Sequence, residues 1–395
     1  KTVAMKFKIV EVVGFIIGCL LAFHCDIGNA LKCLDEFGDE KDWIIGYKLP
    51  RLHKSHSERV SEGYGYSYVT NENFLEPFWD ISNQSVDSNV SVLGYTLSQL
   101  YGNPNLQNIL YVAYNDEPPD RNKTETKGHT KGVFAFDETS GFWLIHSIPK
   151  FPAPFTTSYS YPHSGTYYGQ SFICISLSTK FADKLGTYIS YNGPSIYTWN
   201  IPAEMEKDLP HLDDYFSGNI VIDAPYYMVD NLTSLAGTNF TIFAKNKLFN
   251  KDLYSDLVAP TFKTDLLTET WRNGPNPLVS ECSAANRVEN IEEVVIADTP
   301  ANLVFPSTED HSKWAVSQTE SKPWLCIGDI NRMQSQARRG GGTACISNPQ
   351  LWSRYHKSIT RVEQCAPVDV SVNYNFIKEV QKFFKIVLNI FVIVT

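Results

Sequence analysis

The stretch GHTKGVFAFDETSGFWLIHS (residues 128–147) and the stretch DHSKWAVSQTESKPWLCIGDINR (residues 310–332) carry the same pattern. Each has a His-x-Lys triplet as its second to fourth residues. A Trp-Leu pair follows, with its tryptophan 14 residues past the histidine in the first copy and 13 in the second. One His-x-Lys triplet predicts almost nothing by itself. Two copies with matching continuations indicate a single site that is built twice.

The two triplets are expected in extended segments, where residues i and i+2 point to the same face. His129 then projects together with Lys131, and His311 together with Lys313. We also expect the Trp-Leu strands, residues 142–146 and 324–327, to pair back onto these segments. Such pairing would present further polar groups beside each triplet.

Two imidazoles and two ammonium groups suit phosphodiester hydrolysis without a metal. One histidine can attack phosphorus and form a phosphohistidine, while the other protonates the leaving oxygen. Lysines and an amide such as Asn331 would hold the charge of the non-bridging oxygens. A metal site is disfavoured, because the sequence lacks a His-Glu-x-x-His motif and a lysine beside each histidine repels a cation. We therefore expect no metal and no cofactor.

This is the chemistry of the phospholipase D superfamily, whose site joins two His-x-Lys motifs from two similar halves. Residues 328–331, Gly-Asp-Ile-Asn, resemble that superfamily's Gly-Ser-x-Asn element, with Asp329 in place of the serine. The acid that usually follows His-x-Lys has no clear match. Asp137 is available in the first copy, and the second copy has no counterpart.

Short β-rich runs alternate with helical patterns along the chain. The expected strands cover residues 43–48, 108–113, 132–136, 142–146 and 171–177, and the expected helices cover 91–101, 177–186 and 246–257. Interleaved strands and helices predict an α/β or α+β fold. The resemblance to phospholipase D further implies two pseudo-repeated lobes, each with a β-sheet flanked by helices. Three prolines between residues 194 and 210 place the lobes at 31–200, with the first triplet, and 201–366, with the second.

Both ends of the chain differ from its body. Residues 1–30 include Lys6 and Lys8, an apolar run and small residues before position 31, which is typical of a signal peptide for the secretory pathway. Residues 367–395 form a tail of unknown role. Its apolar part, 383–395, is too short to cross a bilayer, so no stable membrane span is expected.

Cysteines and sequons support a secreted or lysosomal protein. Six cysteines follow the predicted leader, an even number that indicates three disulfides among 15 possible pairings. Five Asn-x-Ser/Thr sequons predict glycosylation at Asn83, Asn89, Asn122, Asn231 and Asn239.

The charge balance narrows the conditions for binding nucleic acid. A formal net charge of −9 at pH 7 argues against a nucleic-acid partner at neutral pH, because phosphate contacts need positive charge. Most of the eight histidines beyond the leader would be protonated near pH 5, which removes most of that negative charge.

A closer resemblance covers nearly the whole chain after the leader. The sequence is similar to the deoxyribonuclease II family of acid endonucleases. The matching stretches are DWIIGYKLP (42–50), AYNDEPP (113–119), GHTKGV (128–133), GFWLIHSIPKFP (141–152), YGQSFICIS (168–176), STEDHSKW (307–314) and RRGGGTAC (338–345). The resemblance implies DNA as the partner. If a histidine attacks phosphorus and the 5′ oxygen leaves, hydrolysis of the phosphohistidine gives 3′-phosphate and 5′-hydroxyl ends.

The resemblance also implies roles for individual residues. It matches His129, His146 and His311 to the histidines on which the family's activity depends, and Lys131 and Lys313 to its paired lysines. The implied disulfides are Cys33–Cys174, Cys282–Cys365 and Cys326–Cys345. Residues enclosed by the last pair are candidates for substrate contact, namely Asp329, Asn331, Arg338 and Arg339.

Less specific interpretations remain for several of these residues. His146 closes an apolar strand, where a histidine is often a hydrogen-bonded core residue. Asp329 and Asn331 could form a turn, and residues 338–342 could be a solvated hairpin tip rather than a phosphate-binding loop. Tyr47 and Lys48 lie near the site by resemblance, or on a strand facing solvent.

Two other functions stay open at this stage. The chain could hydrolyse lipid headgroups as a phospholipase D-like enzyme, with its apolar tail at a membrane. It could instead be a non-catalytic, DNA-binding or toxin-like member of the same family. The sequence leaves open which histidine attacks, whether the chain is processed, and its oligomeric state.

Overall fold

The computed structural model describes residues 30–76, 79–220, 222–297 and 302–365. Its strands form two large sheets, of seven and nine strands, and its α-helices number seven within these ranges. The predicted mixed α/β class is therefore confirmed. The predicted leader lies outside the described residues except for Ala30, and the predicted tail lies outside them completely.

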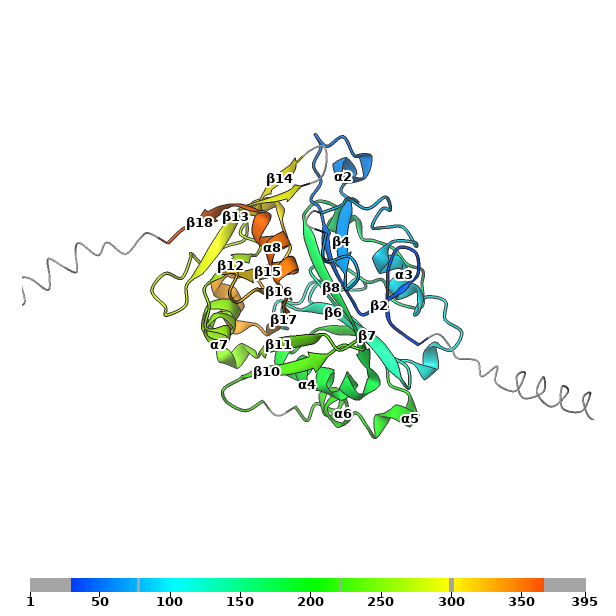
Figure 1. Ribbon diagram of the computed structural model, residues 1–395. Coiled ribbons are helices and arrows are strands. Elements are labelled where there is room, and N and C mark those ends of the chain that lie inside the picture. Colours follow the sequence, from blue (N-terminus) through cyan, green and yellow to red (C-terminus); the bar gives the residue numbers. More distant parts are fainter. Residues whose placement is uncertain (1–29, 77–78, 221, 298–301, 366–395) are drawn as a thin grey trace, which may run out of the picture.

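The first sheet uses strands from the N-terminal part of the chain, coloured blue to green in Figure 1. All its neighbouring strands pair antiparallel. In spatial order the strands are β4 (Tyr66–Thr70), β3 (Trp43–Lys48), β8 (Gln170–Ser178), β7 (Ser140–His146), β6 (Lys131–Phe136), β5 (Leu110–Asn115) and β9 (Ile196–Asn200).

The second sheet uses the later strands, coloured green to orange. Only the β12–β13 pair is parallel among the described strands of this sheet. The spatial order is β10 (Tyr227–Thr233), β11 (Asn239–Lys245), β17 (Gly341–Ser347), β16 (Trp324–Gly328), β15 (Trp314–Ser317), β12 (Leu266–Glu269), β13 (Val288–Ala297) and β14 (Asn302–Pro306), with β18 (Ile359–Glu363) also on β13. A separate two-stranded ribbon joins β1 (Cys33–Leu34) and β2 (Glu40–Lys41).

The helices are short. The α-helices are α2 (Glu58–Glu62), α3 (Val92–Ser98), α4 (Ala182–Asn192), α5 (Ala203–Glu206), α6 (Pro210–Ser217), α7 (Ala259–Phe262) and α8 (Pro349–Lys357). The 3-10 turns are η1 (Leu106–Asn108), η2 (His163–Thr166), η3 (Thr179–Phe181), η4 (Lys247–Phe249), η6 (Ser307–Glu309) and η7 (Gln334–Arg338), and η5 (Tyr254–Val258) is a π-helix. In the part of the chain that the structure describes, no helix is long and apolar enough to cross a membrane.

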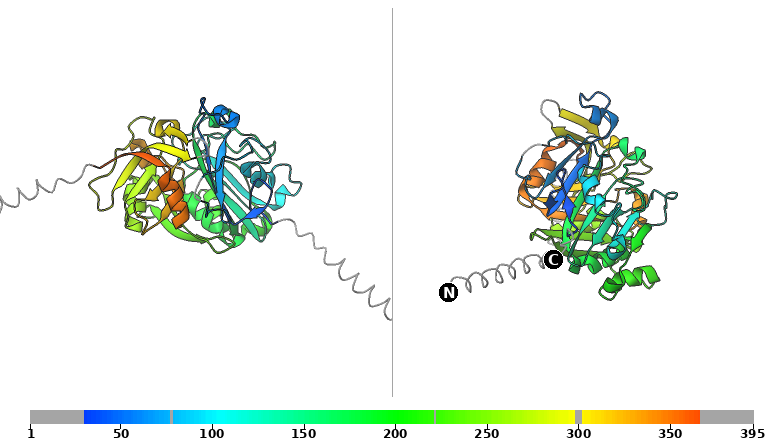
Figure 2. Two further views of the ribbon diagram at one scale, coloured as in Figure 1. Left: turned by 45° about the horizontal axis from the view of Figure 1, so that its top comes forward. Right: turned by 90° about the vertical axis from the view of Figure 1, so that its right-hand side faces the viewer.

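The two sheets share one hydrophobic core, which explains the apolar run in the first quoted stretch. Trp143 and Ile145 of β7 pack into the cluster that also holds Trp314 of β15, while Phe142 and Leu144 pack into a second cluster on the outer face. A strand that is buried on both faces needs an unbroken apolar run. The left view of Figure 2 shows the two halves of the chain side by side, and β8 contacts β16 directly.

The predicted hairpins are confirmed. β6 pairs antiparallel with β7, and β15 pairs antiparallel with β16, so each Trp-Leu strand folds back onto its own His-x-Lys segment. Both triplets lie in extended chain at the entrance of a strand. Lys131 is the first residue of β6, and Lys313 immediately precedes β15.

Two predicted helices differ from the structure. The pattern at 177–186 begins as the end of β8, and the helix that follows is α4, which ends at Gly193 in a left-handed conformation. The predicted helix at 246–257 is wrong as one element. Asn250 adopts a left-handed backbone (φ 52°) after η4, and the Asp252 carboxylate then accepts from the backbone N–H of Tyr254 and Ser255, which starts a new helical segment.

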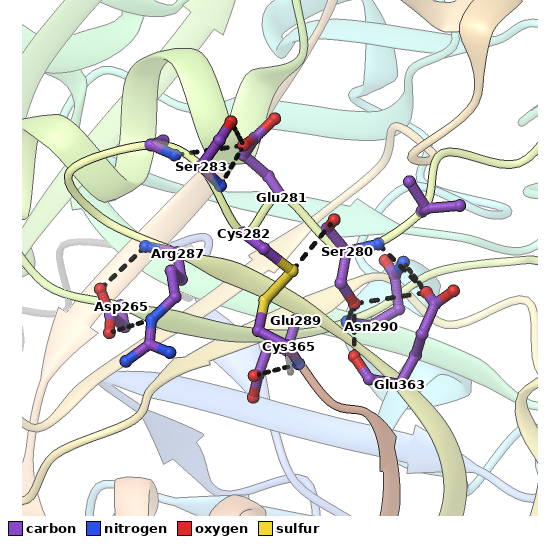
Figure 3. The surroundings of a disulfide bond; sticks show 12 residues. Asp265, Ser280, Glu281, Cys282, Ser283, Arg287, Glu289, Asn290, Glu363 and Cys365 are labelled. Atoms are coloured by element: carbon purple, nitrogen blue, oxygen red, sulfur yellow. Dashed lines mark hydrogen bonds and ion pairs between the residues drawn. A yellow bond between two sulfur atoms is a disulfide. The ribbon is translucent and has the colours of Figure 1, made fainter. Parts of the chain in front are cut away.

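The three disulfides join Cys33–Cys174, Cys282–Cys365 and Cys326–Cys345, as predicted. Figure 3 shows the second of them, which ties the loop after β12 to the end of β18. Beside it, the Glu363 carboxylate accepts from Asn290 Nδ2 at 2.7 Å and from the backbone N–H of Ser280 at 3.1 Å. These contacts hold the loop from residue 270 to 287 against the second sheet.

Candidate active site

A cavity of about 710 Å³ opens where the ends of the two sheets meet. Both predicted triplets line it through His129, Lys131, His311 and Lys313. Five lysine and arginine side chains line the cavity against three carboxylates, so it suits an anion. The predicted substrate residues Asn331, Arg338 and Arg339 also line it.

Each triplet is held by the opposite sheet through the same backbone contact. The His129 N–H donates to the Gly340 carbonyl at 2.8 Å, just before β17 of the second sheet. The His311 N–H donates to the Gly169 carbonyl at 2.8 Å, just before β8 of the first sheet. Neither histidine can reach its place unless both sheets are assembled.

The middle residue of each triplet points inward and is tied to a buried carboxylate. Thr130 Oγ1 donates to Asp329 across the two sheets, while Ser312 Oγ donates to Asp310 at 2.7 Å within its own segment. Tyr47 donates to the same Asp310. Alternation along an extended chain puts histidine and lysine on the cavity side and this hydroxyl on the buried side.

Ionised and amide groups surround His129. Its Nδ1 lies 2.8 Å from the Gln336 amide oxygen, so Nδ1 carries the hydrogen and Nε2 is left toward the cavity. Nε2 lies 3.9 Å from Asp116 Oδ2. Burial lowers the pKa of His129 well below its usual value, and the Asp116 carboxylate opposes that shift.

Asp116 forms ion pairs with the basic side chains on the His129 side of the cavity. Lys131 Nζ donates to its Oδ1, and Arg339 Nη2 lies 3.1 Å from its Oδ2. Although burial opposes ionisation, Lys131, His129 and Arg339 together hold the pKa of Asp116 well below its usual range. Asp116 therefore stays a carboxylate throughout the acid range.

Aromatic rings surround His311 instead. The Tyr168 ring stacks on it at 4.4 Å with an interplanar angle of 11°, and the Trp271 ring meets it edge-on at 3.9 Å. Burial first, and then the lysines Lys313 and Lys131, lower the pKa of His311 far below its usual value. His311 is consequently neutral over almost the whole acid range.

Lys313 lies next to His311 on the second side of the cavity. Its Nζ donates to the His311 carbonyl, which keeps the ammonium close to the ring. Burial, together with the charge of Lys131, lowers the pKa of Lys313 to about 7. The two lysines of the repeated motif thus face one another across a single anion site.

Several predicted residues lie outside the cavity lining, among them His146, Asp329 and Lys48. His146 is fully buried at the end of β7, where its Nδ1 accepts from the Ile148 N–H at 3.2 Å and its ring meets Phe151 edge-on. Burial lowers the pKa of His146 to about 3. Asp329 is also buried, and accepts from the Gly342 N–H at 2.9 Å in addition to Thr130. Lys48 is buried too, and donates to the carbonyls of Thr166 and Tyr168.

The loop closed by Cys326 and Cys345 belongs to the site. The two cysteines are directly opposite one another on β16 and β17. The loop between them carries Asn331, Gln336 and Arg339, so the disulfide fixes the strand ends from which these side chains reach the cavity. A loop of this size gains roughly 3 kcal/mol from cross-linking in the chain-entropy model.

The comparisons with known proteins agree with this geometry. The model of the family described as Deoxyribonuclease II matches residues 32–365. This chain belongs to the deoxyribonuclease II family. It is 38% identical over 365 residues to Deoxyribonuclease-2 of Caenorhabditis elegans, covering 85% of this chain and 94% of that protein. It is 36% identical over 348 residues to Plancitoxin-1 of Acanthaster planci (88% and 96%) and 34% identical over 341 residues to Deoxyribonuclease-2-alpha of Sus scrofa (85% and 91%).

The chain is therefore a deoxyribonuclease II-type endonuclease, and the cavity is its candidate active site. Sequence reasoning missed four residues of this deoxyribonuclease II site, namely Asp116, Gln336, Tyr168 and Trp271. Asp116 and Tyr168 were within the stretches that carry the resemblance, but no role was inferred for them. Asp137, considered as the acid of the first motif, caps the turn between β6 and β7 by accepting from Thr139 and Ser140, and does not line the cavity.

The described residues hold no group of three or more His, Cys, Asp or Glu side chains placed to bind a metal ion. Asp116, a carboxylate of the cavity lining, is already paired with Lys131 and Arg339.

Proposed function

We propose that this deoxyribonuclease II hydrolyses DNA in acid, without a metal, to 3′-phosphate and 5′-hydroxyl ends. The observation that carries the proposal is the meeting of two His-x-Lys motifs, one from each sheet, in one cationic cavity. A phosphodiester placed there has a lysine from each motif and Arg339 beside its non-bridging oxygens. These fixed donors stabilise the charge that develops in the transition state.

The unequal surroundings of the two histidines support different roles for them. His311 is the nucleophile, because its aromatic pocket and neighbouring lysines favour the neutral ring. His129 is the general acid, because Asp116 favours its protonated form. In the first step a ring nitrogen of His311 forms a bond to phosphorus, the bond from phosphorus to O5′ breaks, and His129 gives its proton to O5′.

The second step reverses the proton transfer. Neutral His129 now takes a proton from a water molecule, whose oxygen attacks the phosphohistidine. The bond between phosphorus and His311 breaks, and the 3′-phosphate leaves. Both histidines and all protons are restored, so the cycle needs no further reactant.

The same assignment explains an acid optimum. The protonated form of His129 requires acid because burial lowers its pKa, and burial together with the neighbouring lysines lowers the pKa of His311, which keeps that ring neutral in acid. Activity should therefore follow a bell-shaped pH profile with its maximum near pH 5. Protonated histidines also reduce the negative charge of the protein, which favours approach of DNA.

His146 and Asp329 act as positioning residues in this proposal. The His146 ring fixes the chain just before Ser147, which lines the cavity, through its bond from Ile148. Asp329 ties Thr130 of the first motif to the second sheet. Of the other predicted substrate residues, Asn331, Arg338 and Arg339 remain candidates for phosphate contact.

We further propose that the chain is a phospholipase D-like pair of lobes, 31–200 and 201–366. The matching backbone bonds from His129 to Gly340 and from His311 to Gly169 support this repeat. Three disulfides agree with the secretory pathway, and we propose a lysosomal or extracellular site of action. The five sequon asparagines are all exposed, as glycosylation would require.

The test is digestion of supercoiled plasmid in excess chelator at pH 5, followed by analysis of both ends. Direct labelling of the 5′ ends by a polynucleotide kinase, without prior phosphatase treatment, is the expected result. A requirement for Mg²⁺, or 5′-phosphate products, would contradict the mechanism. Release of a lipid headgroup without DNA cleavage would instead support the lipid phosphodiesterase that the sequence left open.

A further inference from the structure

We propose that the glycan attached to Asn239 folds back onto the protein and that its first sugars fill a groove of about 400 Å³ beside this asparagine. The groove is thus a carbohydrate-binding site whose ligand belongs to the same chain. The inference goes beyond the proposed function, because it concerns neither DNA nor the active-site cavity. It requires that the predicted glycosylation of Asn239 takes place, and the closing experiment measures this.

The groove lies at the opposite end of the strands from the active site. Trp324 begins β16 and Ser347 ends β17, where the two residues are direct partners and both line the groove. The loop at the other ends of these two strands carries Asn331 and Arg339 of the cavity. Trp43, the first residue of β3, adds a wall from the first sheet. The groove therefore spans the join between the two sheets and stays clear of the active site.

The described side chains that line the groove are all uncharged, in contrast to those of the cationic cavity. Aromatic rings come from Trp43, Phe74 and Trp324, and the polar groups are amides and hydroxyls, such as those of Asn71 and Ser347. A pyranose ring has an apolar face of C–H groups and a rim of hydroxyls, so it matches this lining. A charged group would lose its hydration without gaining a partner. The lining therefore favours a neutral sugar.

The aromatic walls of the groove keep uncovered surface. Phe262 covers one face of the Trp324 indole, with ring centroids 3.8 Å apart and an interplanar angle of 10°. Trp324 is nevertheless only half-buried, so the rest of its surface is open to the groove. On the other wall Phe74 meets Trp43 at 5.9 Å with a tilt of 49°, and Phe74 is also half-buried. A sugar ring between these walls would remove apolar surface from water.

Asn239 stands at the edge of the groove. It is the first residue of β11, its side chain is exposed, and it lines the groove. The Thr233 hydroxyl donates to Asn239 Oδ1 at 3.0 Å, which fixes the plane of the amide. The nitrogen Nδ2, to which an N-linked glycan is attached, is then on the side of the amide away from Thr233. The first sugar consequently begins beside the groove lining and needs no linker to reach it.

The hairpin that carries Asn239 is tied to the Trp43 wall. Asp42 precedes Trp43 and is buried. Its carboxylate accepts from Ser234 Oγ at 2.6 Å and from Thr238 Oγ1 at 2.9 Å, at the turn between β10 and β11. These bonds fix the attachment point of the glycan relative to the wall before any sugar is bound. A preformed site binds its ligand with a smaller loss of conformational entropy.

The hairpin also carries a second sequon, which provides a control. Asn231 on β10 is opposite Thr241, whose hydroxyl donates to Asn231 Oδ1 at 3.0 Å. This bond matches the one from Thr233 to Asn239. Both asparagines are exposed and both belong to an Asn-x-Thr sequon, but Asn231 does not line the groove. The two sites thus share sequence motif, strand pairing and hydrogen bond, and differ in the groove.

The experiment measures how fast a peptide-N-glycosidase removes each glycan from the native, full-length protein secreted by animal cells. Mass spectrometry of proteolytic peptides gives the occupancy of Asn239 and of Asn231 over time. Release from Asn239 should be slower by about tenfold or more, since contacts with an aromatic ring change an equilibrium by a factor on the order of ten. After unfolding in urea the two rates should become similar. Equal rates in the native protein, or an Asn239 that carries no glycan, would overturn the inference.

Two variants open the groove from different walls. Trp324→Leu and Phe74→Leu each remove one aromatic ring and keep apolar bulk, so each should bring release from Asn239 to within about threefold of release from Asn231. Trp199→Leu is the matched control, because Trp199 also stacks on a phenylalanine but lines neither the groove nor the cavity. It should leave the native ratio unchanged. A ratio that persists in both groove variants, or that also falls in Trp199→Leu, would contradict the groove as the sugar site.

Thermal unfolding gives an independent readout of a glycan that contacts both sheets. Asn239→Gln and Asn231→Gln each lose one glycan and the hydrogen bond of one asparagine, so their difference reports the groove contacts. Asn239→Gln should melt about 2 °C below Asn231→Gln. The kcat/KM on DNA should stay within about twofold of wild type in both, because the groove lies away from the cavity. Equal melting temperatures, or a loss of activity confined to Asn239→Gln, would overturn the inference whether or not the proposed reaction is correct.

Discussion

The two His-x-Lys motifs share a backbone arrangement and differ in almost everything around it. His129 lies beside an amide and a carboxylate that also binds an arginine, whereas His311 lies against two aromatic rings. The carboxyl groups near the two motifs differ in their pKa values. Asp116 beside His129 has a lowered pKa, while burial raises the pKa of Asp310 and of Glu269 beside His311. A repeated frame thus places two like groups in different surroundings, and this difference is the basis of the roles proposed for them.

The most direct test of this difference between the two motifs is to replace each histidine in turn. His129→Asn and His311→Asn should each lower kcat on DNA by about 10²- to 10⁴-fold, the usual value of a group that transfers a proton or attacks. A p-nitrophenyl ester of thymidine 3′-phosphate then distinguishes them, because its leaving group needs no proton. His129→Asn should recover most of its activity on this ester, and His311→Asn should not.

Secretion yield and unfolding of both histidine variants provide the control for folding. Recovery by His311→Asn rather than His129→Asn would mean that the two roles are exchanged. Activity above a few per cent of wild type on DNA in either variant would contradict the two-motif site.

The next largest effect is expected at Asp116. Asp116→Asn leaves Lys131 and Arg339 without their counter-charge, and removing one partner of a buried ion pair typically costs about 3–5 kcal/mol of stability. It also lowers the pKa of His129, because the group that favours the imidazolium is gone. The alkaline limb of the kcat/KM profile should therefore move to lower pH.

Urea unfolding and a pH–rate profile measure the two effects of Asp116→Asn. Asp137→Asn is the matched control, since that carboxylate caps a turn away from the cavity. An unchanged alkaline limb in Asp116→Asn would contradict the proposal that Asp116 favours the protonated form of His129.

A smaller effect, on stability alone, is expected at Asp329. Burial raises its pKa from 3.8 to about 7. Between these values the unfolded chain releases the proton that the native protein keeps, so native stability falls as pH rises. The neutral isostere Asp329→Asn removes this pH dependence. Its amide oxygen can accept from the Gly342 N–H, and its NH2 group can donate to Thr130 Oγ1 in place of the bond that Thr130 donates to Asp329.

The free energy of unfolding, measured in urea at several pH values, gives the test of Asp329. Relative to Asp329→Asn, wild type should lose up to about 1.4 kcal/mol per pH unit between pH 4 and pH 7. Parallel stability curves over this range would show that Asp329 titrates normally.

The smallest effect is expected at Glu269. Its carboxyl is fully buried without a hydrogen-bond partner in the described structure, and burial raises its pKa well above the usual value. Because the group is already neutral in acid, Glu269→Gln should change kcat/KM at pH 5 by less than about twofold. A drop of tenfold or more would show that an ionised Glu269 takes part in the reaction of the His311 side.

The sequence predicted the half of the site that is repeated, and missed the half that is not. The repeat identified both triplets, and the loop residues Asn331 and Arg339 followed from the resemblance. Nothing in the local pattern marks Asp116, since it lies in an acidic turn and is buried only because β5 pairs with β6. Gln336 lies 207 residues from His129 and meets it only once the two sheets have assembled.

The fold also has parts that the sequence predicted and parts that it did not. Strands with two buried faces, such as β7, were found because their apolar runs are unbroken. The helix expected at 246–257 failed because hydrophobic spacing ignores the left-handed Asn250 and the capping carboxylate of Asp252. Local chemistry at two polar residues outweighed the periodicity of the whole segment.

The backbone hydrogen bonds from His129 to Gly340 and from His311 to Gly169 are arranged as a two-fold axis between the sheets would arrange them. Gly340 lies two residues before Gly342, the partner of Asp329, and Gly169 lies two residues before Ser171, which donates its N–H to Ser147 in the corresponding place. An interface of this kind is isologous: two identical copies of one half would satisfy it as well as two different halves do. A symmetric pair would contain two equivalent histidines, each equally able to give or to accept a proton. Joining two such halves in one chain would free each side to change alone, as the different roles proposed for His129 and His311 require.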